Sequence, residues 1–345
     1  MSSIYLKRTP IARNDSWRRL YQQRLSNTPA FPYESSGFIV FLLFGLSYLL
    51  IGIILILTSA KLQEHQIDYS DCVSPNGQPI CSKELNLFKD LQAPVYMYYK
   101  ITNFYQNHRN FARSVSMEQL RGVTASNESL KRCHPLSSSK NGSQEYIYMP
   151  CGLLSNSIFN DTFLLNFIES PSSKHPVPLL SSSIAWKSDV EKMYGTLPPN
   201  GWNGTIKPPN WPKPAYERSP GAFKTDQELM VWNRIAAFPT FIKLHRILDT
   251  RTDLFASGLP AGKYSLEITS NFPVGAFGGT KAVIFAQVNW LGRRNIWLGV
   301  IFTVTALLHF AIGCYSWARK RSPRLWLPPE EDPVLAPYDM LLKNL

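Results

Sequence analysis

Residues 37–58 read GFIVFLLFGLSYLLIGIILILT, and no charged side chain occurs among them. Residues 296–318 read IWLGVIFTVTALLHFAIGCYSWA, in which His309 is the only titratable group besides Tyr and Cys. At about 1.5 Å per residue, each stretch would form a helix roughly 33 Å long, enough to cross the hydrocarbon core of a bilayer. A buried core helix rarely runs this long without a charge, so we expect two transmembrane helices. The first stretch begins too late, and lacks the small-residue cleavage site, for a removable signal peptide.

Basic residues flank both apolar stretches on their outer sides. They are Arg18, Arg19 and Arg24 before the first stretch, and Arg319, Lys320, Arg321 and Arg324 after the second. Because Lys and Arg gather on the cytoplasmic side of membrane proteins, residues 1–36 and 319–345 are predicted to be cytosolic tails. Residues 59–295 then form one exoplasmic domain. Arg293 and Arg294 lie on the exoplasmic side and weaken this charge asymmetry.

N-glycosylation sequons support the same orientation. Four lie between the apolar stretches, at Asn127, Asn141, Asn160 and Asn203. Because N-linked glycans are added only on the lumenal or extracellular side, all four are predicted glycosylation sites. A fifth match, at Asn14, falls in the predicted cytosolic tail, and we expect it to stay unmodified. The sequence leaves the final membrane open among endoplasmic reticulum, Golgi apparatus, endosome and plasma membrane.

Cysteines indicate cross-links in the exoplasmic segment. Cys314 lies inside the second apolar stretch, where we expect a reduced packing residue. The other four are Cys72, Cys81, Cys133 and Cys151, and an even number in an oxidising compartment predicts two disulfides with three possible pairings. Nearest-neighbour pairing is the simplest, because it would close a short Pro-Asn-Gly turn and one longer loop. Each closure is worth roughly 3 kcal/mol by chain entropy.

The exoplasmic segment carries several β-strand signals. Residues 262–270, GKYSLEITS, alternate apolar and polar side chains as a half-buried strand does. Residues 281–288, KAVIFAQV, predict a second strand, joined to the first across residues 275–280, and residues 94–105 are also β-prone and aromatic. We therefore expect a mainly antiparallel, sandwich-like β domain with a few short helices.

Two further patterns concern the region between these strands. A capping-box pattern at 225–228 predicts a short helix that continues through Trp232 and Ile235 until Pro239 ends or kinks it. Residues 198–220 hold seven prolines and predict a packed irregular loop.

No catalytic arrangement is evident. The chain contains no Gly-rich phosphate loop, GxSxG, HExxH or aspartyl-phosphate DKTG motif. The exoplasmic histidines lack metal-ligand spacing, and Asp189 and Glu191 indicate a solvated surface pair rather than an acid/base pair. Basic residues beside anionic cytoplasmic lipid explain the net charge of +12 without a nucleic-acid partner. We therefore expect no catalytic residue, no metal and no cofactor apart from glycans.

Small residues recur every seven positions in both apolar stretches. The two sets are Gly45, Gly52 and Ser59 in the first, and Gly299, Ala306 and Gly313 in the second. Such stripes let helix backbones approach closely, which favours helix association in lipid, although Gly is frequent in membrane helices anyway. We expect these residues to contact a partner helix, together with His309, for which inter-helix packing is favoured over a proton relay.

Several sequence blocks, taken in order, resemble one family. PVYMYYKITNFYQNHRNFARS (94–114) resembles the most recognisable block of the flippase β-subunit family, also called the cell-division-control-protein-50 or transmembrane-protein-30 family. The blocks that follow in the family's order are PCGLLSNSIFND (150–161), IAWKSD (184–189), DQELMVWNRIAAFPTFIKL (226–244) and the Gly-x-Tyr…Asn-Phe-Pro-Val run at 262–274. The similarity is strong over residues 94–300 and weak in the tails.

The resemblance implies a non-catalytic β-subunit that forms a heterodimer with a type-four P-type ATPase. Such a subunit accompanies its partner out of the endoplasmic reticulum and supports its transport of phospholipid from the exoplasmic to the cytosolic leaflet. ATP, magnesium and the phosphorylated aspartate would belong to the partner. Two departures occur: the extra cysteines that members commonly carry near the first pair are absent, and Arg293 replaces the second glycine of their Gly-Gly-(Lys/Arg)-Asn run.

Other functions stay open at this point. A two-span channel subunit would need a polar pore-lining face, which Ser47, Tyr48, Thr303, Thr305 and His309 do not make convincingly. An exoplasmic glycosidase or lipase would need a nucleophile or a carboxylate pair. A free-standing adhesion glycoprotein is the third alternative.

Overall fold

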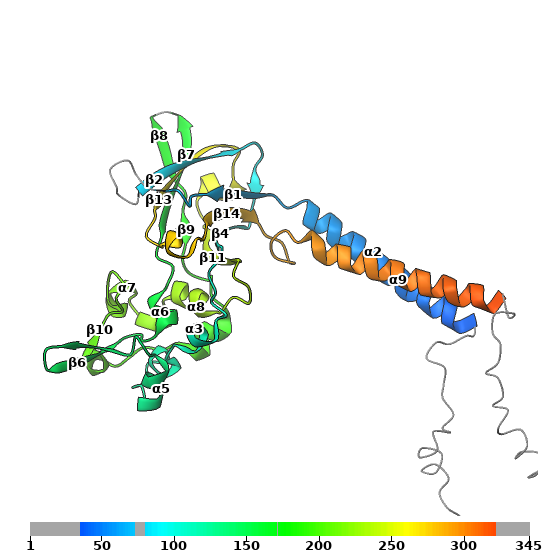
Figure 1. Cartoon of the computed structure of the whole chain (residues 1–345). Coiled ribbons are helices and arrows are strands. Elements are labelled where there is room, and N and C mark those ends of the chain that lie inside the picture. The colour runs from blue at the N-terminus through cyan, green and yellow to red at the C-terminus, as the bar shows by residue number, and fades with distance from the viewer. Residues whose placement is uncertain (1–34, 73–79, 171, 322–345) are drawn as a thin grey trace, which may run out of the picture. The chain divides into compact units, whose positions relative to one another are not determined.

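The computed structural model describes residues 35–72, 80–170 and 172–321 (Figure 1). It consists of two compact units: the two long terminal helices up to Ile56 and from Trp297, and the ectodomain, Leu57–Ile296. Most of both predicted cytosolic tails, the Asn14 sequon and the Pro-Asn-Gly turn that follows Cys72 lie outside the described residues.

The two long helices coincide with the apolar stretches. Helix α2 spans Ser35–Ala60 and helix α9 spans Ile296–Arg321. Within them, Gly37–Ala60 and Ile296–Ala318 are long and apolar enough to cross a membrane. The prediction of two membrane-length helices that flank one domain is confirmed, with boundaries shifted by two or three residues.

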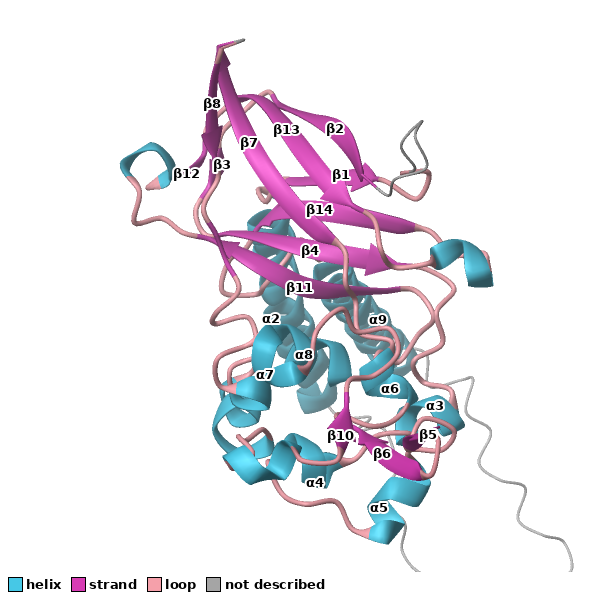
Figure 2. Cartoon of the chain, turned by 90° about the vertical axis from the view of Figure 1, so that its left-hand side faces the viewer, coloured by secondary structure: helices cyan, strands magenta, loops and turns pink. Residues whose placement is uncertain are grey.

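The ectodomain contains two large antiparallel sheets, as Figure 2 shows. The five-stranded sheet has the order β1 (Glu64–Asp68), β14 (Lys281–Gln287), β4 (Val95–Ile101), β11 (Phe241–Leu248) and β9 (Leu179–Leu180). The four-stranded sheet has the order β2 (Ile80–Leu87), β13 (Gly262–Thr269), β7 (Thr162–Ser170) and β8 (Ser173–Pro176). Two small sheets pair β12 (Gly258–Leu259) with β3 (Leu91–Gln92), and β10 (Thr205–Ile206) with β6 (Gln144–Tyr148) and β5 (Ser138–Asn141). The predicted mainly antiparallel β domain is confirmed.

The first hydrophobic core combines side chains of both large sheets. On β13, the alternation seen in the sequence places Tyr264, Leu266 and Ile268 in this core with no exposed surface. Strand β14 does not alternate because every one of its residues is buried. The two strands follow one another in the chain, yet β13 pairs with β2 and β7 while β14 pairs with β1 and β4, so they lie in different sheets.

The second core lies where short helices gather beside β11 (Figures 1 and 2). The α-helices are α3 (Arg109–Arg113), α4 (Met117–Leu120), α5 (Asn127–Arg132), α6 (Leu153–Asn156), α7 (Ala215–Arg218) and α8 (Gln227–Asn233). The π- and 3-10-helical turns are η1 (Asp189–Met193), η2 (Pro199–Trp202), η3 (Ala222–Lys224), η4 (Asp253–Phe255) and η5 (Val274–Phe277). Trp211 and Trp232 fill this core. The proline-rich loop is therefore packed, as predicted.

Helix α8 differs in detail from the sequence prediction. Its N-cap is Asp226 rather than Thr225, and the Asp226 carboxylate accepts a hydrogen bond from the Leu229 N–H at 3.0 Å. The Thr225 hydroxyl instead accepts from the Gly221 N–H. The helix ends at Asn233, before Ile235 and well before the proline that was expected to end it.

A buried ion pair joins distant parts of the ectodomain. The Lys281 ammonium on β14 lies 2.8 Å from the Asp161 carboxylate, and both side chains are almost completely buried. Asp161 also accepts hydrogen bonds from the Tyr69 hydroxyl and from the backbone N–H groups of Asn271 and Phe272. The carboxylate thus has four donors, which satisfy a charge that would otherwise be costly to bury.

We expect Asp161→Asn to destabilise the ectodomain by about 3–5 kcal/mol, because it leaves the Lys281 ammonium buried without its counter-charge. The substitution keeps the Asn160 sequon intact. Chemical unfolding of the purified full-length chain measures the effect. The matched control is Asp71→Asn, which removes the exposed Lys83–Asp71 pair and should cost less than about 1 kcal/mol. Equal midpoints for the two variants would contradict the role given to the buried pair.

Candidate functional site

Both disulfides follow the nearest-neighbour pairing. Cys72 bonds to Cys81, and Cys133 bonds to Cys151. Cys133 and Cys151 have no exposed surface, and the Cys151 N–H donates to the Gln119 side-chain carbonyl at 2.7 Å. The second disulfide therefore anchors α5 to the segment that enters α6. The remaining cysteine, Cys314, is free as expected, but it is exposed on α9 rather than packed.

The sequon asparagines differ in their surroundings. Asn127, at the start of α5, and Asn203, after η2, are exposed. Asn160 is half-buried, and its side-chain carbonyl oxygen has no hydrogen-bond partner among the residues that the structure describes. Asn141 ends β5, and its side chain is outside the described part of the chain. Exposure of Asn127 and Asn203 is compatible with glycosylation, which stays a prediction at all four positions.

The small residues of α2 and α9 face one another within this chain. A methyl group on Gly52 would lie 2.6 Å from the Thr303 hydroxyl oxygen, and one on Gly299 would lie 2.9 Å from the Gly52 carbonyl oxygen. One on Gly45 would lie 2.6 Å from the Phe310 ring, and Ala306 has no exposed surface. The backbones approach so closely because no side chain separates them.

His309 and Gly313 extend the same contact. The His309 ring centroid lies 5.1 Å from that of Tyr48, and its Nδ1 is 2.8 Å from the Thr305 carbonyl oxygen. A methyl group on Gly313 would lie 3.4 Å from Phe41 Cβ. All the predicted contact residues thus contact the other helix of the same chain, and a contact between them and a partner's helix stays a prediction.

We expect Gly299→Leu to weaken the pairing of α2 with α9 by about 1–3 kcal/mol, because the new side chain has no space beside Gly52. Cysteines placed at Phe41 and Gly313 report the pairing, since their Cβ atoms are within disulfide range. The two cysteines are introduced into a Cys314→Ala chain and oxidised in membranes. The yield of the cross-link should be on the order of tenfold lower with Gly299→Leu than without it. Ile301→Phe, on an exposed face of α9, is the control and should leave the cross-link unchanged.

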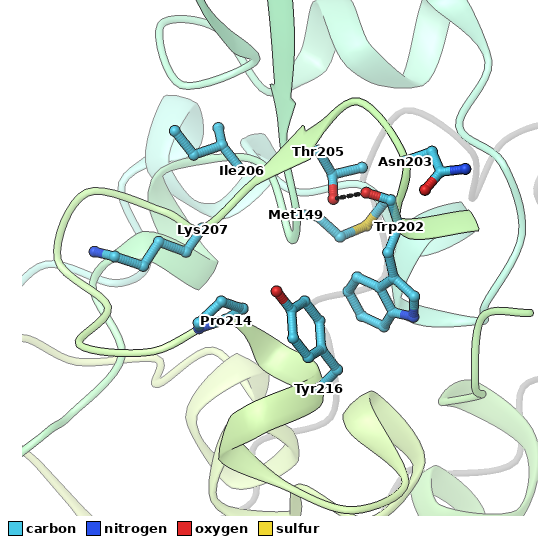
Figure 3. Close-up of a pocket in the computed structure, with 8 residues that line it drawn as sticks. All are labelled: Met149, Trp202, Asn203, Thr205, Ile206, Lys207, Pro214 and Tyr216. Atoms are coloured by element: carbon cyan, nitrogen blue, oxygen red, sulfur yellow. Dashed lines mark hydrogen bonds between the residues drawn. The ribbon is translucent and has the colours of Figure 1, made fainter. Parts of the chain in front are cut away.

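A pocket of about 620 Å³ opens beside the second core (Figure 3). The rings of Trp202 and Tyr216 lie side by side in its lining in an edge-to-face contact, with centroids 5.2 Å apart. The Thr205 hydroxyl donates to the Trp202 carbonyl, and the Lys207 ammonium donates to the Trp211 carbonyl at 2.6 Å. The lining contains no carboxylate, histidine or cysteine. Its aromatic and aliphatic walls suit binding rather than acid–base chemistry.

Buried titratable groups of the second core have structural partners. His245 is the extra residue of a β-bulge in β11, and burial among aromatic rings lowers its pKa to about 3. Burial lowers the pKa of Lys243 to about 7, and its ammonium donates to the carbonyls of Val231, Trp232 and Arg234 at the end of α8. His245 is thus held by ring contacts, and Lys243 by hydrogen bonds to the end of α8.

One acidic pair was misjudged from the sequence. Asp189 is buried and accepts two hydrogen bonds from the Arg234 guanidinium, which also stacks on Trp186. Glu191 alone is a surface residue, paired with Lys187 at 3.7 Å. The interpretation of both carboxylates as a solvated surface pair was therefore wrong for Asp189, because spacing in sequence carries no information about a cation 45 residues away.

Sequence reasoning also missed a charged network at the start of α8. Arg218 lies 2.6 Å from both Asp226 and Glu228, and Glu228 also bonds Arg246 on β11. Burial would raise the pKa of Glu228, but Arg246 and Arg218 hold it below its ordinary value. Among the described residues, no group of three His, Cys, Asp or Glu side chains is placed to hold a metal ion.

Comparison with known proteins identifies the family of this chain. Residues 55–322 match the model of the LEM3 (ligand-effect modulator 3) family / CDC50 family. The chain belongs to the CDC50 family. The match covers the whole ectodomain and α9, so it includes both disulfides, the buried ion pair and the aromatic pocket.

Individual CDC50 relatives extend the match to most of the chain. Cell cycle control protein 50A of Bos taurus is 36% identical, and the alignment covers 85% of each chain. Cell cycle control protein 50B of Homo sapiens is 34% identical over 85% of this chain and 89% of the relative. A fungal relative from Chaetomium thermophilum, 33% identical over 70% of this chain and 60% of its own length, is named phospholipid-transporting ATPase accessory subunit CDC50.

Proposed function

We propose that this chain is the non-catalytic subunit of a phospholipid flippase complex, bound as a heterodimer to a type-four P-type ATPase. The observation that carries the proposal is the similarity to a CDC50 protein named as the accessory subunit of a phospholipid-transporting ATPase. The partner would hold ATP, magnesium and the phosphorylated aspartate, and would move phospholipid from the exoplasmic to the cytosolic leaflet. This chain would hold no cofactor of its own apart from N-linked glycans.

The architecture suits an accessory role. The ectodomain has two large sheets, two cores and two disulfides, which form a cross-linked scaffold for its surface. An ordered surface loses little conformational entropy on binding and can favour those partner states whose exoplasmic loops fit it. By linkage, the subunit biases the transport cycle only as far as it binds those states more tightly than the others.

Both termini are proposed to be cytosolic, with the ectodomain lumenal or extracellular. The basic flanks of α2 and α9 and the four sequons support this orientation. The complex would form in the endoplasmic reticulum and work in that membrane or, after export, in the Golgi apparatus, an endosome or the plasma membrane.

Purification of the tagged full-length chain in mild detergent tests the pairing. We expect a P-type ATPase in near-equal amount, identified by mass spectrometry, and a phospholipid-stimulated ATP hydrolysis that falls when the chain is depleted. The untagged chain, taken through the same steps, is the control. Lipid-stimulated hydrolysis that stays the same when the chain is depleted would contradict the proposal. An ion current from the chain alone would favour a channel subunit.

Export from the endoplasmic reticulum is proposed to depend on the buried Cys133–Cys151 disulfide. Replacing both cysteines with Ser removes roughly 3 kcal/mol of chain-entropy stabilisation from the domain. We expect the glycans of this variant to stay sensitive to endoglycosidase H, and the co-expressed pump to stay in the endoplasmic reticulum. The control is Cys314→Ser, which changes the only cysteine on the described helices and should leave glycan maturation unchanged. Normal maturation of the double variant would show that the disulfide is dispensable for export.

A further inference from the structure

A tight turn in the ectodomain directly precedes helix α9. Asn289 and Gly292 exchange backbone hydrogen bonds at 2.9 and 3.1 Å, and the Asn289 side chain accepts from the Leu291 N–H at 2.9 Å. Gly292 has a φ of +93°, which only glycine adopts without strain. At the tip of this turn, Trp290 is 76% exposed. Exposing so large an apolar ring to water is unfavourable.

The turn is attached to the ends of both long helices. The Asn289 side-chain N–H donates to the Thr58 carbonyl in the last turn of α2 at 3.4 Å. The Asn295 N–H, one residue before α9, donates to the Ser59 hydroxyl at 2.7 Å. These contacts lie within the ectodomain unit, which includes the end of α2 and the first residue of α9. Trp290 therefore lies beside the points where the chain enters and leaves the apolar helices.

The basic residues near this turn differ in their surroundings: one forms an ion pair within the chain, and two face solvent. Arg293 is used inside the fold, because it lies 2.7 Å from the Glu64 carboxylate on β1. Arg294 and Lys61 are exposed, and neither forms an ion pair among the described residues. An exposed indole flanked by exposed cations, next to the ends of two membrane-length helices, is the combination that the headgroup region of a bilayer stabilises.

We infer that the Asn289–Gly292 turn is a lipid-surface anchor on the exoplasmic side. Trp290 lies at the depth of the glycerol and upper acyl region, and Lys61 and Arg294 contact lipid phosphates. The anchor holds the base of the ectodomain, where β1 and β14 end, against the bilayer. It also gives the arginines on the exoplasmic side distinct roles: Arg293 binds Glu64 and Arg294 binds lipid. The inference needs the two membrane spans but not the proposed pump.

A polarity-sensitive probe at position 290 tests this inference. A nitrobenzoxadiazole group is attached to Trp290→Cys in a Cys314→Ala full-length chain, in which the other cysteines are in disulfides. The chain is placed in phosphatidylcholine vesicles with or without brominated acyl chains. The same probe at Tyr216→Cys, on the rim of the aromatic pocket, is the matched control. We expect blue-shifted emission at 290 and quenching on the order of twofold stronger than at 216.

Two further variants sharpen the result. Leu291→Cys carries the probe on the adjacent residue if Trp290→Cys does not fold, and should also be quenched by brominated lipid. Lys61→Gln together with Arg294→Gln should reduce the quenching, and unchanged quenching would overturn the phosphate contacts. Red-shifted, unquenched emission at 290 would overturn the anchor. Blue-shifted emission without quenching by brominated lipid, in the chain alone or in complex with a pump, would also overturn it, because protein would then cover the turn.

Discussion

The antiparallel ladder between β1 and β14 is the interaction on which the rest of the ectodomain depends. Strand β1 begins at Glu64, four residues after α2 ends, and β14 ends at Gln287, nine residues before α9 begins. Glu64 lies opposite Ala286, so the chain enters and leaves the domain at the same end of the same strand pair. The more than two hundred residues between these strands therefore form one domain whose two ends are joined by backbone hydrogen bonds.

Strand β14 also links the β1–β14 ladder to the remainder of the domain. Its residues are buried on both faces, and its first residue, Lys281, forms the buried ion pair with Asp161. The next strand in the sheet, β4, contributes Val95 and Met97 to the first core and Tyr99 and Ile101 to the second. Strand β4 therefore belongs to both cores, and its pairing with β14 connects both of them to the β1–β14 ladder.

The sequence predicted those features that local chemistry determines. The membrane-length helices follow from the absence of charge in 37–58 and 296–318, and β13 follows from its strict alternation. Cys133 and Cys151 lie close enough in the chain for the simplest pairing to be right. The family resemblance, carried by several blocks in order, agrees with the match to the CDC50 model.

The sequence could not supply contacts between residues far apart in the chain. Asp161 and Lys281 are separated by 120 residues, and nothing in either neighbourhood indicates the other. The assignment of β13 and β14 to different sheets depends on partners at β2, β7, β1 and β4, not on the loop that joins them. The small-residue stripes had a similar ambiguity, because periodicity identifies the face of a helix that packs but not the helix that it meets.

The close packing of α2 against α9 limits how a partner could bind. Gly52, Gly299 and Ala306 are occupied by close packing between α2 and α9, so these residues already have the contact that small residues permit. A partner's helices would then meet the outer faces of the pair, where Leu43, Leu50, Ile301 and Leu308 are exposed. Large aliphatic side chains pack less closely than glycine, and lipid competes for the same faces because it is equally apolar. In the proposed flippase complex, specificity for one pump would therefore have to come mainly from the ectodomain, whose polar and aromatic surface can distinguish partners by shape and hydrogen bonding.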